Sequence, residues 1–86
     1  MAYSILISKR ATKDIGKLPA QLRTRLQQKL QWFVAQPDPI DFAEALTKPA
    51  DAQYRFRVGD FRVLFDAEHD TIIILRVQHR REIYRR

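Results

Sequence analysis

The sequence predicts an α+β fold in which two N-terminal helices pack on one face of a small, mainly antiparallel sheet, in the order β-α-α-β-β-β. Two observations carry most of this prediction. Residues 19–36 place apolar side chains at helical spacing, and residues 54–65 alternate arginine with apolar side chains around a Gly-Asp dipeptide. A third is the apolar run at residues 71–79, which is typical of a central strand. A chain of 86 residues is expected to form a single domain, residues 1–86.

The N-terminal segment is predicted to form a strand followed by a short helix. Residues 2–7 form a strand-length apolar run, and Ser8 is a good N-cap because its hydroxyl can accept from a free amide of the first turn. Ala11, Ile15 and Leu18 then recur at spacings of four and three, which predicts a helix of about nine residues.

A second helix is predicted from Pro19 to about Gln36, since proline is tolerated in a first helical turn. Its apolar stripe consists of Leu22, Leu26, Leu30, Phe33 and Val34. Trp32 lies off this stripe and is expected to pack at the helix edge, the alternative being a partner-docking position. Prolines at positions 37 and 39 end the helix.

The segment 37–52 is expected to connect the second helix to the sheet, with Phe42 and Leu46 anchoring a helical turn over the sheet rim. After the hairpin, residues 66–70 are predicted to form a polar turn. The last strand, residues 71–79, is predicted to put Thr71, Ile73, Leu75 and Val77 on one face and Ile72 and Ile74 on the other.

Gly59-Asp60 predicts a two-residue hairpin turn, because glycine supplies the positive φ that the first turn position requires. The turn sets the register: Val58 faces Phe61, Arg57 faces Arg62, Phe56 faces Val63, Arg55 faces Leu64, and Tyr54 faces Phe65. One face of the hairpin is then apolar and aromatic. The other, called the arginine face below, carries Arg55, Arg57 and Arg62.

Arg57 directly opposite Arg62 is unfavourable in a strand pair, because like charges repel. With no acid expected among them, the three arginines indicate an anion site, since the guanidinium is a planar donor fork suited to phosphate. The plainer alternative is a solvated face that happens to be basic. We expect the C-terminal residues Arg80, His79 and Tyr84 to reach the rim of this face.

Composition narrows the class of partner. A net charge of +6 and a pI near 10.2 favour a polyanionic partner, either nucleic acid or an acidic protein. The absence of cysteine excludes disulfides and thiolate metal sites and suits the cytoplasm. No signal peptide, membrane partner, cofactor or metal is expected.

The arginine face could bind RNA and also assist its cleavage. In such a reaction a ribose 2′-OH attacks the adjacent phosphate, which requires a general base, a general acid and cations that stabilise the developing charge. Arginine stays protonated and can do only the last of these jobs. The base is therefore expected to be Tyr84 or His79.

The segments Tyr54-Arg-Phe-Arg-Val-Gly-Asp-Phe-Arg-Val-Leu-Phe65 and Val77-Gln-His-Arg-Arg-Glu-Ile-Tyr84 resemble the RelE/ParE superfamily of bacterial type II toxins, with the RelE-like branch favoured. The resemblance implies metal-independent mRNA cleavage in the ribosomal A site, leaving a 2′,3′-cyclic phosphate and a 5′-hydroxyl. It also implies an acidic antitoxin. The site residues it implies are Arg55, Arg57, Arg62, Arg80 and Tyr84.

Two departures from the family pattern affect the site. The hairpin carries arginine where RelE-type sites often carry lysine, which removes a lysine base, and Gln78 stands where many members have glycine. The C-terminal motif aligns loosely, so Arg80 and Arg81 could exchange roles. Arg76 and Arg81 are expected to add RNA contacts.

The predicted function is that of a toxin acting as a ribosome-dependent mRNA endoribonuclease. Its expected partners are an acidic antitoxin, the ribosome and mRNA, with operator DNA reached through the antitoxin complex. Two alternatives stay open: a ParE-like inhibitor of DNA gyrase, and an inactive basic module that acts only in an antitoxin complex.

Overall fold

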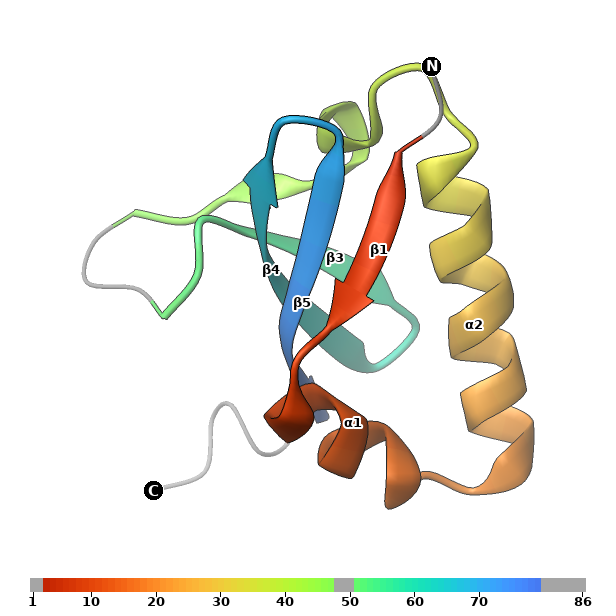
Figure 1. Cartoon of the computed structure of the whole chain (residues 1–86). Coiled ribbons are helices and arrows are strands. Elements are labelled where there is room, and N and C mark those ends of the chain that lie inside the picture. The colour runs from red at the N-terminus through yellow and green to blue at the C-terminus, as the bar shows by residue number, and fades with distance from the viewer. Residues whose placement is uncertain (1–2, 48–50, 80–86) are drawn as a thin grey trace.

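The computed structural model describes residues 3–47 and 51–79 and has the predicted α+β architecture (Figure 1). The elements are β1 (Ser4–Ile7), α1 (Lys9–Gly16), α2 (Ala20–Val34), the 3₁₀ helix η1 (Pro39–Phe42), β2 (Glu44–Ala45), β3 (Tyr54–Val58), β4 (Phe61–Glu68) and β5 (Thr71–His79). The sheet order is β1-β5-β4-β3-β2. Only the β1–β5 pair is parallel in this sheet, so the prediction of a mainly antiparallel sheet is confirmed.

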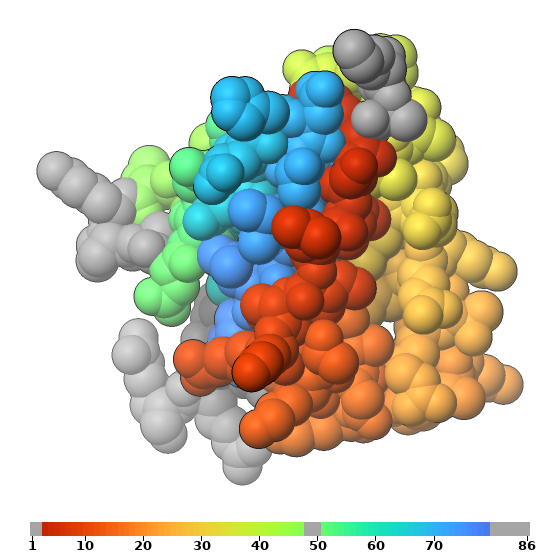
Figure 2. Space-filling view, viewed as in Figure 1, coloured from red at the N-terminus to blue at the C-terminus, as the bar shows by residue number. Residues whose placement is uncertain are grey.

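Beyond the end of β1, helix α1 and its N-cap lie along the edge of β5 in place of a neighbouring strand. Figure 2 shows its surface (orange) continuing that of β1 (red). The backbone N–H of Ser8 donates to the carbonyl of Ile74 at 2.9 Å, and the Ser8 hydroxyl donates to the carbonyl of Leu75 at 3.1 Å. The same hydroxyl oxygen accepts from the N–H of Ala11 at 3.0 Å, which confirms the predicted N-cap. One serine therefore both starts α1 and fixes it to β5.

The core lies between α2 and the aromatic face of the hairpin. The stripe residues Leu26, Leu30 and Phe33 are buried. The ring of Phe33 stacks on Phe56 with centroids 3.9 Å apart, and Phe56 stacks on Phe65 at 4.3 Å. Because a domain of this size buries a limited fraction of its surface, such large aromatic groups supply much of its apolar burial. No helix in the described ranges is long and apolar enough to cross a membrane.

The hairpin has the predicted register throughout, from Val58 opposite Phe61 to Tyr54 opposite Phe65. Gly59 adopts a φ of +59° at the first turn position, where a side chain would be strained. The alternation therefore separates two faces as expected, with Phe56 and Val63 buried against the helical layer.

The faces of β5 differ from the prediction, which placed Val77 opposite Ile72 and Ile74. All three are buried in the same core. The cause is a β-bulge: Leu64 pairs with residue 76 and its neighbour pairs with Ile74, so Leu75 is an extra residue on β5. An extra residue reverses the alternation beyond it. The predicted central position of β5 is confirmed.

The connections also differ from the predictions. In place of a helical turn anchored by Phe42 and Leu46, the chain forms η1 and then the short strand β2. Phe42 is 49% exposed, and its ring packs edge-on against Trp32, which is itself partly exposed. The predicted polar turn at 66–70 is shorter, because β4 continues to Glu68.

Candidate nucleic-acid interface

The structure gathers Arg55, Arg57 and Arg62 on the sheet face that points away from the core. Arg57 and Arg62 are direct cross-strand neighbours on β3 and β4, and Arg55 is two residues from Arg57 on β3. Their exposure differs: Arg62, on the more central strand, is 8% exposed, whereas the side chain of Arg57 is 63% exposed. The group therefore runs from an almost buried arginine to an open one.

An acid that the sequence analysis missed lies on this face. Strand β2 adds to the edge of β3 and places Glu44 directly opposite Arg55. Arg55 donates from Nε and from a terminal nitrogen to the two carboxylate oxygens of Glu44, both at 3.3 Å. Arg57 forms an ion pair with the same carboxylate, its Nε lying 3.2 Å from Oε1. The expectation that no acid lies among the arginines is therefore wrong.

These contacts set the protonation of Glu44. The hydrogen bond from Arg55, together with its charge, lowers the pKa of the Glu44 carboxyl, and the charges of Arg57 and Arg62 act in the same direction against a desolvation effect. Glu44 is thus an anion at neutral pH. It relieves the repulsion that opposed arginines would otherwise impose on the hairpin.

Beside this ion pair lies a shallow cavity of about 290 Å³, lined by Phe42, Ala43, Glu44, Arg55 and Arg57. It combines two guanidiniums, one carboxylate and an exposed aromatic ring. The sequence carries no clear signal for this cavity, because a two-residue strand shows no periodicity and Arg55, which pairs with Glu44, lies eleven residues away from it.

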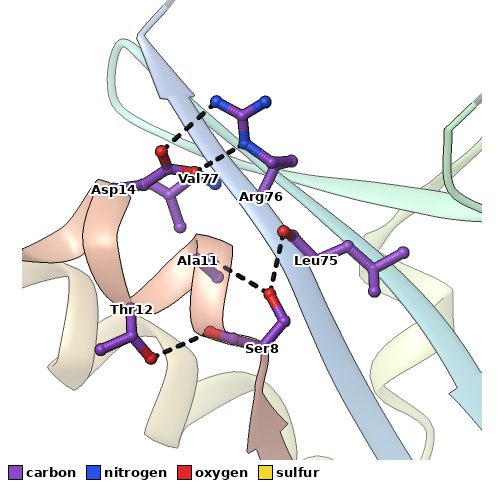
Figure 3. Close-up of polar contacts among 7 residues, drawn as sticks. All are labelled: Ser8, Ala11, Thr12, Asp14, Leu75, Arg76 and Val77. Atoms are coloured by element: carbon purple, nitrogen blue, oxygen red, sulfur yellow. Dashed lines mark hydrogen bonds and ion pairs between the residues drawn. The ribbon is translucent and has the colours of Figure 1, made fainter.

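Arg76, predicted to bind RNA, is held by α1 at the opposite edge of the sheet (Figure 3). Its Nε donates to Oδ2 of Asp14 at 2.8 Å and a terminal nitrogen donates to Oδ1 at 3.3 Å. The backbone N–H of Val77 donates to the same carboxylate at 2.9 Å. Asp14 thus closes the edge of β5 that β1 leaves uncovered.

The protonation of Asp14 reflects these three donors. Burial raises the pKa of the Asp14 carboxyl, but the hydrogen bonds from Arg76 and Val77 and the charges of Arg76 and Lys17 together hold it below its usual value. The pair is ionised and largely shielded from water, with 23% of the Arg76 side chain and 13% of the Asp14 side chain exposed.

His79 does not lie on the arginine face. The register of β4 and β5 puts it opposite Phe61, and its ring meets Phe61 edge-on with centroids 5.1 Å apart. It lines a cavity of about 340 Å³ with Leu22 of α2, on the helical side of the sheet. The expectation that His79 reaches the arginines is not met. The other predicted C-terminal residues, Arg80, Arg81 and Tyr84, lie outside the described residues.

The described residues of this face are suited to holding an anion. Arginine does not give up its proton at working pH, and the ionised carboxylate of Glu44 is a poor proton acceptor while it is bonded to two guanidiniums. In the described part of the chain, no three His, Asp or Glu side chains lie close enough to hold a metal ion. The chemistry available here is binding of phosphate and stabilisation of negative charge.

The chain is similar to known proteins over nearly its whole length. A family model described as ParE toxin of type II toxin-antitoxin system, parDE, matches residues 5–84. Toxin RelG of Mycobacterium tuberculosis is 31% identical over 88 residues, covering 100% of both chains. Toxin RelE3 of Methanocaldococcus jannaschii is 30% identical and covers 93% of each chain.

Solved structures match the fold over nearly its whole length. A chain of the archaeal RelE-RelB complex from Pyrococcus horikoshii superimposes with a TM-score of 0.72 and 28% identity, covering 93% of this chain and 97% of that one. A RelB-RelE antitoxin-toxin complex from Methanococcus jannaschii gives a TM-score of 0.69 and 29% identity, covering 92% and 94%. With a family match from residue 5 to residue 84 and full-length relatives named RelG and RelE, the chain belongs to the RelE/ParE superfamily of type II toxins.

Proposed function

We propose that this toxin is a ribosome-dependent endoribonuclease that cuts mRNA and so inhibits translation. One observation carries the proposal: Arg55, Arg57 and Arg62 converge on one face of a rigid hairpin whose other face is buried in the core. Sites on packed strands hold their side chains more precisely than sites on loops. A fixed group of guanidiniums is suited to the phosphodiester of a bound message.

In the proposed reaction the ribose 2′-oxygen attacks the adjacent phosphorus and the bond from phosphorus to the 5′-oxygen breaks. A base takes the 2′-OH proton, and an acid protonates the leaving 5′-oxygen, giving a 2′,3′-cyclic phosphate and a 5′-hydroxyl. Arg62 supplies preorganised positive charge, which is most effective where water is largely excluded. Because His79 lies on the helical side of the sheet, Tyr84 is the proposed base, and Arg80 or Arg81 is proposed to add a positive charge.

The proposed partners follow from charge and from the relatives. The similar structures from Pyrococcus and Methanococcus are complexes of RelE with RelB. For this chain, with its net charge of +6, we propose an acidic antitoxin that covers the basic surface and can bring it to operator DNA. The ribosome and mRNA are the proposed targets, and the cytoplasm is the proposed location.

A second candidate function is inhibition of DNA gyrase, which the ParE description of the matching family model favours. Both activities fit the same fold, so the fold cannot choose between them. The arginine face favours the endoribonuclease, because inhibition of gyrase by binding does not require positive charge directed at a scissile phosphate.

The test is to incubate the purified toxin with ribosomes programmed with a defined mRNA, map the 5′ ends, and assay gyrase supercoiling in parallel. We expect new mRNA ends with 5′-hydroxyl groups in the ribosomal A site and unchanged supercoiling. An intact message together with inhibited supercoiling would establish that the protein inhibits DNA gyrase instead. An intact message and normal supercoiling would favour the inactive binding module.

A further inference from the structure

The carboxylate of Glu44 occupies the place where an anion would bind. It receives two donors from Arg55 and lies 3.2 Å from Nε of Arg57, so three guanidinium nitrogens converge on one carboxylate. Arginine forks bind carboxylate and phosphate oxygens through the same parallel hydrogen bonds. A phosphate of a bound nucleic acid can therefore satisfy the same donors in place of Glu44.

Glu44 is placed where it can leave this position. Half of its side chain is exposed, at 50%, and it sits on the two-residue edge strand β2. Exposed ion pairs contribute little to stability because water and salt screen them. Rotation of the Glu44 side chain into solvent would free both guanidiniums and would leave the core contacts of the hairpin in place.

The same cavity offers a surface for a nucleobase. The exposed ring of Phe42 lines it together with Arg55 and Arg57. Contact with Trp32, at 5.0 Å between centroids, helps to hold this ring in place before a ligand binds. Proteins that bind single-stranded nucleic acid combine cationic side chains with aromatic rings on which bases stack.

We propose that the cavity between η1, β2 and β3 is a nucleotide subsite for single-stranded RNA, in which a phosphate replaces Glu44 on Arg55 and Arg57 and the neighbouring base packs on Phe42. Glu44 is then an internal competitor. It weakens binding of free RNA, so that the toxin needs the additional contacts of a ribosome-bound message. This subsite rests on the proposed function in so far as it takes RNA as the substrate.

The test measures binding of a 2′-O-methyl oligoribonucleotide, which cannot be cleaved, to the wild type, Glu44→Gln and Glu68→Gln. The two variants lose the same charge, but they differ in place. Leu64 is the residue of β4 that pairs with Arg55, and Glu68 lies about 13 Å farther along that strand. We expect Glu44→Gln to bind about threefold to tenfold more tightly than wild type at low salt, and Glu68→Gln to change affinity by less than about twofold. Equal affinities for the two variants would overturn the proposal.

A second variant and a second observable complete the test. Phe42→Leu keeps an apolar side chain against Trp32 and is expected to weaken RNA binding about fivefold or more, as stacking losses do. In the wild-type protein, titration with the oligonucleotide should shift the NMR signals of the Nε–H groups of Arg55 and Arg57. Signals that stay in place, or a gain in Glu44→Gln for an acidic peptide and not for RNA, would refute the subsite.

These outcomes separate the subsite from the proposed function. Binding of uncleavable RNA needs no reaction, so selective tightening in Glu44→Gln would support the subsite even if programmed ribosomes released an intact message. Conversely, if the toxin cleaved mRNA on ribosomes but Glu44→Gln and Glu68→Gln bound the uncleavable RNA with equal affinity, the endoribonuclease would be supported and the subsite rejected.

Discussion

Near each of the two edges of the sheet an acid is bound to arginine, and the two ion pairs have different surroundings. At the α1 side, Asp14 accepts from Arg76 and from the backbone N–H of Val77, and both side chains of the pair are mostly buried. At the β2 side, Glu44 is shared by Arg55 and Arg57 and is half exposed. The first acid completes the hydrogen bonding of the main chain, whereas the second touches side chains only.

The difference teaches which arginines are available to a ligand. Removing Asp14 from its site would leave a backbone N–H and a partly buried guanidinium without that acceptor, which is costly. Displacing Glu44 by phosphate would exchange one anion for another at the same donors. We therefore propose that the Arg76–Asp14 pair serves stability and that Arg55 and Arg57 bind RNA, and the following predictions test this division.

The largest effect is expected from the double variant Arg55→Ala/Arg57→Ala. It should slow cleavage of ribosome-bound mRNA about 100-fold to 1000-fold, because it removes charge that stabilises the transition state. Its melting temperature should stay close to that of wild type. Arg76→Ala is the matched comparison: below its melting temperature it should cleave within about threefold of wild type. Similar losses of activity in both variants would break the division between the two edges.

The next effect concerns stability. Asp14→Ala should lower the free energy of unfolding by about 2–3 kcal/mol, because it removes the carboxylate that accepts from the N–H of Val77 and pairs with Arg76. Asp14→Asn should cost less, since its amide oxygen can still accept from Val77. Chemical denaturation measures both values. An unchanged stability in Asp14→Ala would contradict a structural role for this pair.

A smaller effect is expected at the start of the same helix. Ser8→Ala removes the N-cap of α1, whose hydroxyl accepts from the N–H of Ala11 and donates to the carbonyl of Leu75. The variant should lower the free energy of unfolding by about 1 kcal/mol. Thr12→Ala is a suitable control, because the Thr12 hydroxyl donates to the nearby carbonyl of Ser8, at the start of α1, and not to β5. Equal losses in the two variants would show that Ser8 does not fix α1 to β5.

The smallest predicted effect is on pH dependence. The pKa of Asp14 is lower in the folded protein than its ordinary value of 3.8, so its contribution to stability is complete above that pH and is lost as the pH falls through the folded-state value. The stability difference between wild type and Asp14→Asn should therefore be constant near neutrality and narrow below about pH 4. Denaturation curves along an acid series measure it. A difference that widened on acidification would reverse the assigned sign.

Most of the fold could be predicted because it depends on local patterns. The hairpin register follows from a glycine at a position of positive φ and from strict alternation on both sides. Helix α1 follows from Ser8 and the spacing of its apolar residues, and α2 from a longer stripe. In each case the local preference and the tertiary structure agree.

The parts that could not be predicted depend on contacts between distant segments. Strand β2 is too short to show a period, so the acid at Glu44 was not recognised as a neighbour of Arg55. The bulge at Leu75 reverses the faces of β5, and no residue type marks it in the sequence. Arg76 fits a basic site as well as it fits an ion pair, and only the position of Asp14 on α1 decides between them.

We propose above all that the arginine face stabilises the transition state of mRNA cleavage, and the most direct test is the single-turnover cleavage rate of ribosome-bound mRNA by wild type, Arg62→Ala and Arg10→Ala. The two variants lose the same charge, but Arg62 lies almost buried on the sheet and Arg10 is exposed on α1. We predict a rate about 100-fold to 1000-fold lower for Arg62→Ala, with its fold retained, and a rate close to wild type for Arg10→Ala. Equal rates for Arg62→Ala and wild type, or no cleavage by the wild type, would contradict the claim.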